Sequence, residues 1–337
     1  MTEHLERTLT AMADAGLDVM MLGREANVRF VSDVEHLWLS GTRPFAPGCV
    51  VVRSTGTVHL LSTSDAGVPA GISRADLFGV SWNPLTIVGR VADLPGVRDA
   101  RLIGTDGMTP LMEQLLGGFL PSASLVDGEA VLREVRRTKS PSDLDHLRSA
   151  VRVGERCLSA TLDAVAPGVT ERALLARWES TMGRLGVTTP AFEAATCVAG
   201  TAPRSIVTDR VLATGDLVNL RTGVLVDGWS GLVSRTRSVG GATAGQTATA
   251  DRALDALTRT VTACRPGAVV GSLRNGSGVA TLDGVGLGHE ELADSDTLRI
   301  DDVVFVEVFV DSVILGDLAH VGADATVALT TAPYDIT

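Results

Sequence analysis

Residues 215–236 read GDLVNLRTGVLVDGWSGLVSRT, and this stretch decides the fold. Leu217 to Arg221 and Val224 to Val226 are short apolar runs, and the dipeptide Asp227-Gly228 is typical of a tight turn. These features predict a β-hairpin. The order of its parts is more informative than the hairpin alone: Gly-Asp, an apolar strand, a small residue with Gly, a second apolar run, Asp-Gly with an aromatic residue, Ser, and then Arg-Thr.

Composition bounds the class of protein. The chain has 337 residues, of which 45% are hydrophobic, so it is long enough for two domains with sizeable cores. A net charge of -11 argues against nucleic acid and anionic membrane surfaces as partners, and favours a cytoplasmic protein that handles small molecules. The polar start of the chain predicts no signal peptide, and no apolar run approaches the roughly 18 residues of a membrane span. The four cysteines form no CxxC pair, which predicts buried free thiols.

The first part of the chain alternates between expected helices and strands. Helices are predicted at 3–15 and 108–116, and strands at 17–22, 50–52, 58–61 and 123–126. This alternation predicts a small α/β domain of about 125 residues. A helical region follows, in which Ser140 is expected to cap a helix that has Pro141 in its first position. We place the domain boundary near residue 135, giving domains at 1–134 and 135–337.

Several motifs resemble one known family. The hairpin resembles the central hairpin of the pita-bread family, peptidase family M24, which holds methionine aminopeptidase, prolidase and creatinase. The string RRTKSPSDLDHLRSA at 136–150 resembles the entry into that family's catalytic domain, and LDGVGLGHEE at 282–291 resembles its GHGIG…HE motif. The start of the chain resembles the creatinase and prolidase amino-terminal domain. The resemblance implies a mixed α/β (α+β) fold, with a small creatinase-like domain before a pita-bread domain, and a homodimer whose pockets are roofed by the partner's amino-terminal domain.

The resemblance also implies a lost metal centre. Metal-dependent members bind a dinuclear centre through two aspartates, a histidine and two glutamates. The matching places hold Arg221, Leu232, Asp283, Glu307, and Ala323 or its neighbour Gly322. Divalent metals need several oxygen or imidazole ligands that converge on the ion. We therefore expect no metal and no other cofactor.

Acid–base chemistry remains open to this site. Glu307 interrupts an apolar strand, where a carboxylate is costly unless it is paired or used. Glu307 or Asp283 is a candidate general acid or base, and His289 is the candidate proton-transfer partner. Arg221 is expected to replace the charge of the metal, offset both carboxylates and orient an anionic substrate.

Further candidates concern substrate binding. Where creatinase presents its proton-transfer histidine, this chain has Arg204 and Ser205, which are alternatively plain loop residues. Arg43 is either a solvated loop arginine or a clamp for a substrate carboxylate in the neighbouring subunit's pocket. The motifs add four further candidates to this group: Asp227, Trp229, Glu290 and His320.

The leading hypothesis is a metal-independent, creatinase-like enzyme that acts on a small polar molecule. The reaction is C–N hydrolysis, or a lyase, isomerase or cyclase step of the kind used in specialised metabolism. One alternative is a catalytically silent binding or regulatory protein that uses the same pocket. Another is a residual Xaa-Pro aminopeptidase or dipeptidase, which would need metal.

Overall fold

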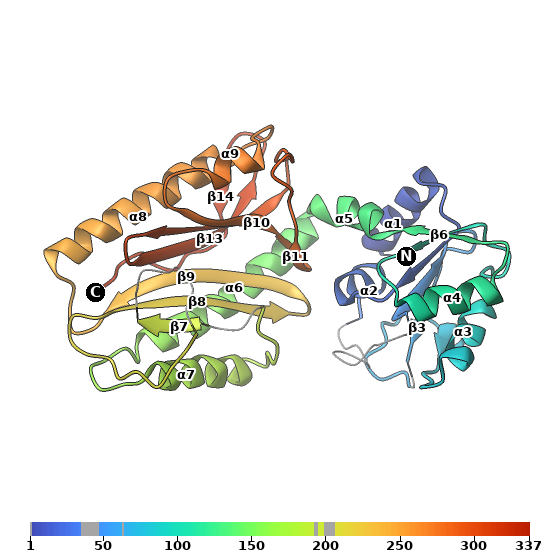
Figure 1. The fold of residues 1–337 in the computed structure, drawn as a ribbon, viewed down its shortest axis with the longest axis horizontal. Helices are drawn as coiled ribbons and strands as arrows, with labels where there is room; N and C mark the ends of the chain where they lie inside the picture. The colour runs from blue at the N-terminus through green and yellow to red at the C-terminus, as the bar shows by residue number, and fades with distance from the viewer. Residues whose placement is uncertain (1, 35–46, 63, 192–194, 199–205) are drawn as a thin grey trace. The chain divides into compact units, whose positions relative to one another are not determined.

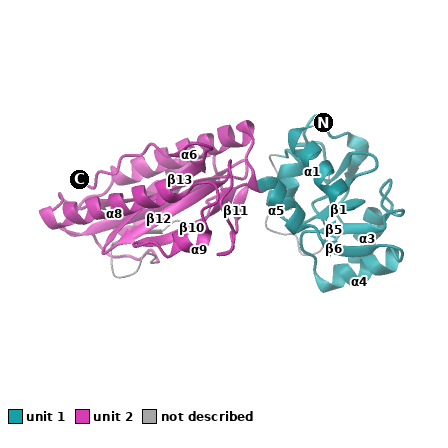
Figure 2. Ribbon diagram, turned by 90° about the horizontal axis from the view of Figure 1, so that it is seen from above, with its two compact units in different colours: residues 1–136 teal, residues 137–337 magenta. Residues whose placement is uncertain are grey.

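The computed structural model describes residues 2–34, 47–62, 64–191, 195–198 and 206–337, with only the backbone described for 195–198 and for His289. The chain forms two compact units, Met1–Arg136 and Arg137–Thr337 (Figure 2). The division falls two residues after the predicted boundary. In the described part of the chain, no helix is long and apolar enough to cross a membrane.

The first unit is a layered α/β domain (Figure 1). Its six-stranded sheet has the order β4-β3-β2-β1-β5-β6, with β1 antiparallel to β2 and parallel to β5. The strands are β1 (Val19–Leu22), β2 (Cys49–Val52), β3 (Thr57–Leu61), β4 (Leu77–Phe78), β5 (Leu102–Thr105) and β6 (Ser124–Asp127). The helices are α1 (Glu3–Asp14), α2 (Glu25–Ser32), the short η1 (Arg74–Asp76), α3 (Pro84–Ala92) and α4 (Pro110–Phe119). Buried residues of β1 and β2, such as Met21 and Val50, share an aliphatic core with α3 and α4.

The helix α5 (Glu129–Arg137) leads into the second unit, whose first long helix is α6 (Pro141–Leu162). Ser140 caps α6: its hydroxyl accepts from the backbone N–H of Asp143, and the Asp143 carboxylate accepts from the backbone N–H of Ser140. The predicted start of this helix is therefore confirmed.

The second unit is built on one curved eight-stranded sheet (Figure 1). Its strand order is β11-β10-β12-β13-β9-β8-β7, and β14 pairs with β13. The strands are β7 (Ala195–Val198), β8 (Leu217–Val226), β9 (Trp229–Ser238), β10 (Val279–Gly286), β11 (Gly288–Glu290), β12 (Val303–Val310), β13 (Val313–Val321) and β14 (Thr326–Ala328). The remaining helices are α7 (Glu171–Arg184), α8 (Ala244–Ala263) and α9 (Val270–Arg274).

Helices cover one face of this sheet. Leu158 of α6 and Leu174 of α7 pack on Leu220 of β8, whereas α8 packs on alternate residues of β12 and β13 such as Val306 and Leu315. Because side chains alternate along a strand, the residues between these positions lie on the opposite face. That face carries Arg221 and Glu307.

The deciding hairpin forms as predicted, with one difference. Residues 217–226 make a single strand, because Thr222 and Gly223 continue the ladder by pairing with residues of β9. The loop is Asp227-Gly228 alone, with φ of 51° and 87°, the positive values that a two-residue type I′ turn requires. This turn fixes the register of β8 against β9.

Among the described side chains, Cys49, Cys157 and Cys264 are buried, and Cys157 and Cys264 are the free thiols that the sequence predicts.

Candidate active site

A single transverse row of residues crosses five strands of the second unit. Each member is the register partner of the next, from β8 through β9, β13 and β12 to β10. In that order the row is Arg221, Ser234, Gly316, Glu307 and Thr281. Residues far apart in the chain therefore meet because the sheet places them at one level.

Glu307 is the centre of the row, and it is completely buried, with 0% of its side chain exposed. Arg221 Nε lies 3.0 Å from both carboxylate oxygens. The hydroxyl of Ser234 donates to Oε1 at 2.7 Å, and Thr281 Oγ1 lies 3.3 Å from Oε2. Both oxygens are thus engaged by donors, as a buried carboxylate requires. Arg221 is 16% exposed, so its side chain joins the buried carboxylate to the surface of the open face.

Gly316 makes this contact possible. A Cβ atom at this position would lie 2.8 Å from Cζ of Phe305 and 3.1 Å from Cβ of Ser234. Because Gly316 has no side chain, Ser234 reaches across it to Glu307.

The strand position opposite Glu307 is therefore Gly316. Gly322 and Ala323, where we expected the last ligand place, follow the end of β13 at Val321 and lie outside the row. Because only two residues connect β12 to β13, the ladder runs without interruption from the pair Val310 and Val313 to the pair Glu307 and Gly316.

The row does not fit a dinuclear metal centre. The guanidinium of Arg221 occupies the space beside Glu307, and neither Leu232 nor Gly316 offers a ligand atom. Within the described ranges, no group of three or more histidine, cysteine, aspartate or glutamate side chains could hold a metal ion. The residues present supply one ion pair where the family's metal-dependent members supply ligands.

Asp283 lies on β10 but has other described partners. Its Oδ1 accepts from the backbone N–H groups of Leu292 at 2.8 Å and Gly284 at 3.0 Å, and Arg274 of α9 is 3.5 Å away. We expected Arg221 to offset both carboxylates. Arg221 contacts Glu307, whereas Arg274, which is ion-paired with Asp294 at 2.6 Å, also lies near Asp283. Asp283 joins β10 to the chain that follows β11, and an effect of Arg221 on Asp283 stays a prediction.

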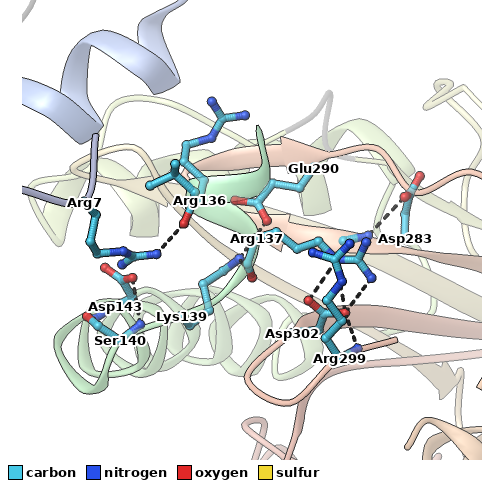
Figure 3. A network of polar contacts seen from close by, with 12 residues as sticks. Arg7, Arg136, Arg137, Lys139, Ser140, Asp143, Asp283, Glu290, Arg299 and Asp302 are labelled. Atoms are coloured by element: carbon cyan, nitrogen blue, oxygen red, sulfur yellow. Dashed lines mark hydrogen bonds and ion pairs between the residues drawn. The ribbon is translucent and has the colours of Figure 1, made fainter. Parts of the chain in front are cut away.

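Glu290, a predicted substrate contact, is buried in an ion pair. Its Oε2 lies 2.7 Å from Nζ of Lys139, and these side chains are 4% and 1% exposed (Figure 3). Lys139 is the only lysine of the chain and also donates to the carbonyl oxygen of Arg137. The carboxylate of Glu290 is enclosed between Lys139 and β10, and its role as a substrate contact stays a prediction.

Three other predicted substrate contacts have described side chains, and each lies in a different part of the second unit. Asp227 is exposed in the hairpin turn, six residues along β8 from Arg221 and thus roughly 20 Å away. Trp229 is buried and stacks on His146, with ring centroids 5.5 Å apart. His320 Nε2 lies 2.8 Å from Oδ1 of Asp301. Their side chains lie in the turn, against α6 and in a local ion pair, and their roles as substrate contacts stay predictions.

The side chains of four further candidates are not described, and these candidates also stay predictions. Arg43, Arg204 and Ser205 lie outside the described residues. The backbone of His289 pairs with Val285 at the edge of β10.

The sequence reasoning missed Ser234, Thr281 and Gly316. One signal was available for the first of them. A two-residue turn at Asp227-Gly228 fixes the register, and counting outward from it pairs Arg221 with Ser234. Gly316 faces Glu307 across the tight β12–β13 connection, so the same counting applies to it, whereas Thr281 depends on pairing between strands that are far apart in the chain.

Comparison with known proteins agrees with this architecture. Residues 145–277 match the model of Metallopeptidase family M24. An Xaa-Pro dipeptidase from Pyrococcus furiosus is 22% identical over 79% of this chain and 73% of its own length. A creatinase from Bacillus sp. is 28% identical over 51% of this chain, which is 42% of that enzyme.

Solved structures extend the likeness to the whole chain. The prolidase from Pyrococcus horikoshii OT3 superposes with a TM-score of 0.80 at 18% identity, covering 100% of both chains. The X-Pro aminopeptidase from Thermotoga maritima MSB8 gives 0.79 at 17% identity, covering 98% of each. These matches confirm the predicted fold, a creatinase-like amino-terminal domain followed by a pita-bread domain. The family-model match, these relatives and the shared fold support placing the chain in the pita-bread family, peptidase family M24.

Proposed function

We propose that this protein is a creatinase-like enzyme that acts on a C–N bond of a small polar molecule without a metal ion. Its family includes prolidases and creatinase, enzymes that hydrolyse C–N bonds. The observation that carries the proposal is the ion pair between Arg221 and Glu307, which stands in the row where metal-dependent relatives place ligands.

The ion pair supplies the charge balance that a metal would otherwise provide. A carboxylate with no exposure needs a counter-charge within a few ångströms, and the guanidinium of Arg221 provides it at 3.0 Å. Since both oxygens of Glu307 accept hydrogen bonds, this geometry gives Glu307 the role of holding Arg221, Ser234 and Thr281 in place. Arg221 then presents a planar cation to the open face, where it suits a carboxylate or another anionic group of the substrate.

Proton transfer is the second requirement. In C–N hydrolysis the hydroxyl of water bonds to carbon, and the nitrogen leaves after it gains a proton. We assign that proton to His289, because the resemblance of residues 282–291 to the family's motif implies that this histidine lines the pocket. We also propose a cytoplasmic homodimer in which Arg43 of a second copy binds the substrate.

Two other functions have specific support. The likeness to an Xaa-Pro dipeptidase and an X-Pro aminopeptidase favours a residual peptidase. The burial of Glu307 behind Arg221 favours a silent binding pocket. A metal-free enzyme is preferred because the row keeps a complete set of charged and hydroxyl partners around Glu307.

A chelator assay separates these functions. The protein is treated with EDTA and incubated with Xaa-Pro dipeptides, creatine, and small amides, ureas and guanidines, and the products are measured by mass spectrometry. We expect turnover in EDTA that Arg221→Met and Glu307→Gln both abolish. The control Arg252→Lys changes an exposed arginine that contacts Asp311 and the neighbouring turn of α8, so it should keep full turnover.

The other outcomes would overturn the proposal. Turnover that appears only after manganese or cobalt is added would establish the peptidase. Saturable binding of a compound without turnover would establish the silent pocket.

A further inference from the structure

Arg235 lies directly behind the row, on the helix-covered face of the sheet. It follows Ser234 on β9, and its register partner is Leu220, which packs on α6 and α7. Its side chain is 2% exposed, so a permanently charged group lies in the interior. Such a group is stable only if its donors are satisfied.

All five N–H groups of this guanidinium have acceptors. Nε donates to the carbonyl oxygen of Pro333 at 3.0 Å. Nη1 donates to the carbonyl oxygens of Ser234 at 2.8 Å and Gly316 at 2.9 Å. Nη2 donates to Asp317 Oδ1 at 3.0 Å and to the carbonyl oxygen of Ala332 at 2.7 Å.

Two of these acceptors belong to the row. Ser234 and Gly316 form the single register pair between β9 and β13 among the described residues, so the two strands meet at this level. Arg235 bonds to both backbones at that point. It therefore fixes the junction from which the Ser234 hydroxyl reaches Glu307 at 2.7 Å.

The remaining acceptors tie the junction to the end of the chain. The ring of Tyr334 lies 4.4 Å from the guanidinium carbon of Arg235, and its hydroxyl donates to Asp317. Burial raises the pKa of Tyr334 above its usual range, so the hydroxyl keeps its proton. Nearby, Glu155 of α6 accepts from the backbone N–H of Ala332 at 2.6 Å. The segment 331–336 is thereby bound to the back of the row.

We propose that Arg235 is a positioning residue for Glu307. It acts through its hydrogen bonds to the backbones of Ser234 and Gly316. The carboxy-terminal segment 331–336 holds the guanidinium in place by accepting two of its hydrogen bonds and packing Tyr334 against it. A substitution at Ser234 should therefore change the environment of Tyr334 on the other face of the sheet. A substitution at Arg235 should change the position of Glu307.

The single tyrosine of the chain gives a direct test. Protein labelled with fluorotyrosine has one fluorine NMR signal, at Tyr334. Ser234→Ala and Thr281→Val each remove one hydroxyl beside Glu307. Of these two residues, Ser234 is the one whose backbone carbonyl oxygen accepts a hydrogen bond from Arg235. We expect Ser234→Ala to shift the signal by more than its linewidth and Thr281→Val to leave it in place. In an Arg235→Lys background, Ser234→Ala should no longer shift it.

An unchanged signal in Ser234→Ala, or an equal shift in Thr281→Val, would overturn the proposal. The comparison of these two variants needs no change at Arg235, so it remains decisive if Arg235→Lys does not fold. It also needs no substrate, so it can succeed or fail independently of the proposed reaction.

With a substrate that the protein turns over, kinetics distinguish a positioning role of Arg235 from a purely structural one. Arg235→Lys should lower kcat by roughly tenfold or more with little change in KM, because it misplaces a group without touching the substrate. The matched control is Arg237→Lys, two residues along the same strand, and it should keep the normal kcat. A purely structural role for Arg235 predicts lower thermal stability with kcat unchanged.

Discussion

Removing Arg221 tests whether the ion pair balances the charge of the row. Arg221→Met leaves a carboxylate with 0% exposure and only two hydroxyl partners, Ser234 and Thr281. Breaking a buried pair in this way typically costs about 3 to 5 kcal/mol. Adding Glu307→Gln to the Arg221→Met variant removes the unpaired negative charge and keeps an acceptor for the Ser234 hydroxyl. The double variant should therefore recover most of the lost stability, to within about 1 to 2 kcal/mol of the natural protein.

Urea unfolding followed by tryptophan fluorescence measures this cycle, because Trp178 and Trp229 are buried in the second unit. The control is Arg252→Met, which breaks an ion pair whose side chains are 54% and 67% exposed. Its effect should stay below about 1 kcal/mol. The reasoning is refuted if Arg221→Met costs no more than this control, or if adding Glu307→Gln deepens the loss.

Three further predictions concern packing and titration. A Cβ at Gly231 would lie 2.2 Å from a carbonyl oxygen of α6, so Gly231→Ala should lower the free energy of unfolding by about 1 to 3 kcal/mol or more in the same urea assay. The control Gly183→Ala adds a methyl group in open space and should leave this free energy unchanged or raise it. Burial lowers the pKa of His59 although Asp76 lies nearby, so the unfolded chain takes up a proton on this histidine at a higher pH than the folded protein does. The free energy of unfolding should therefore fall as the pH drops below about 6.5. His59→Leu should make this fall smaller in thermal scans at a series of pH values. Burial raises the pKa of Cys264 to about 12, so iodoacetamide at neutral pH should leave it unmodified in the native protein, and peptide mapping that finds it alkylated would contradict its burial.

Local chemistry made part of the fold predictable. The cap at Ser140 and the turn at Asp227-Gly228 each depend on residues that are adjacent in sequence, and both formed as expected. The apposition of Arg221 and Glu307 followed from the family motifs, because each motif fixes a position on a particular strand. The ion pair between them is what the electrostatics of a buried carboxylate require.

The side-chain surroundings of the other candidate residues could not be predicted from the sequence. A motif gives a residue's place in the chain but not the packing of its side chain. Glu290 is enclosed by Lys139, which is 151 residues earlier in the sequence, and Trp229 is covered by His146 of α6. Arg274, which lies 3.5 Å from Asp283 and pairs with Asp294, is on a five-residue helix in a stretch where the family motif gave no guide.

The most direct test of the central claim is elemental analysis of the purified protein by inductively coupled plasma mass spectrometry. The measurement is made before and after incubation with manganese, cobalt, zinc and iron, followed by desalting. If the pair between Arg221 and Glu307 replaces the metal centre, the natural protein should retain far less than one ion per chain. One or two tightly held ions per chain, lost in Glu307→Gln, would contradict the account and make the peptidase the leading function.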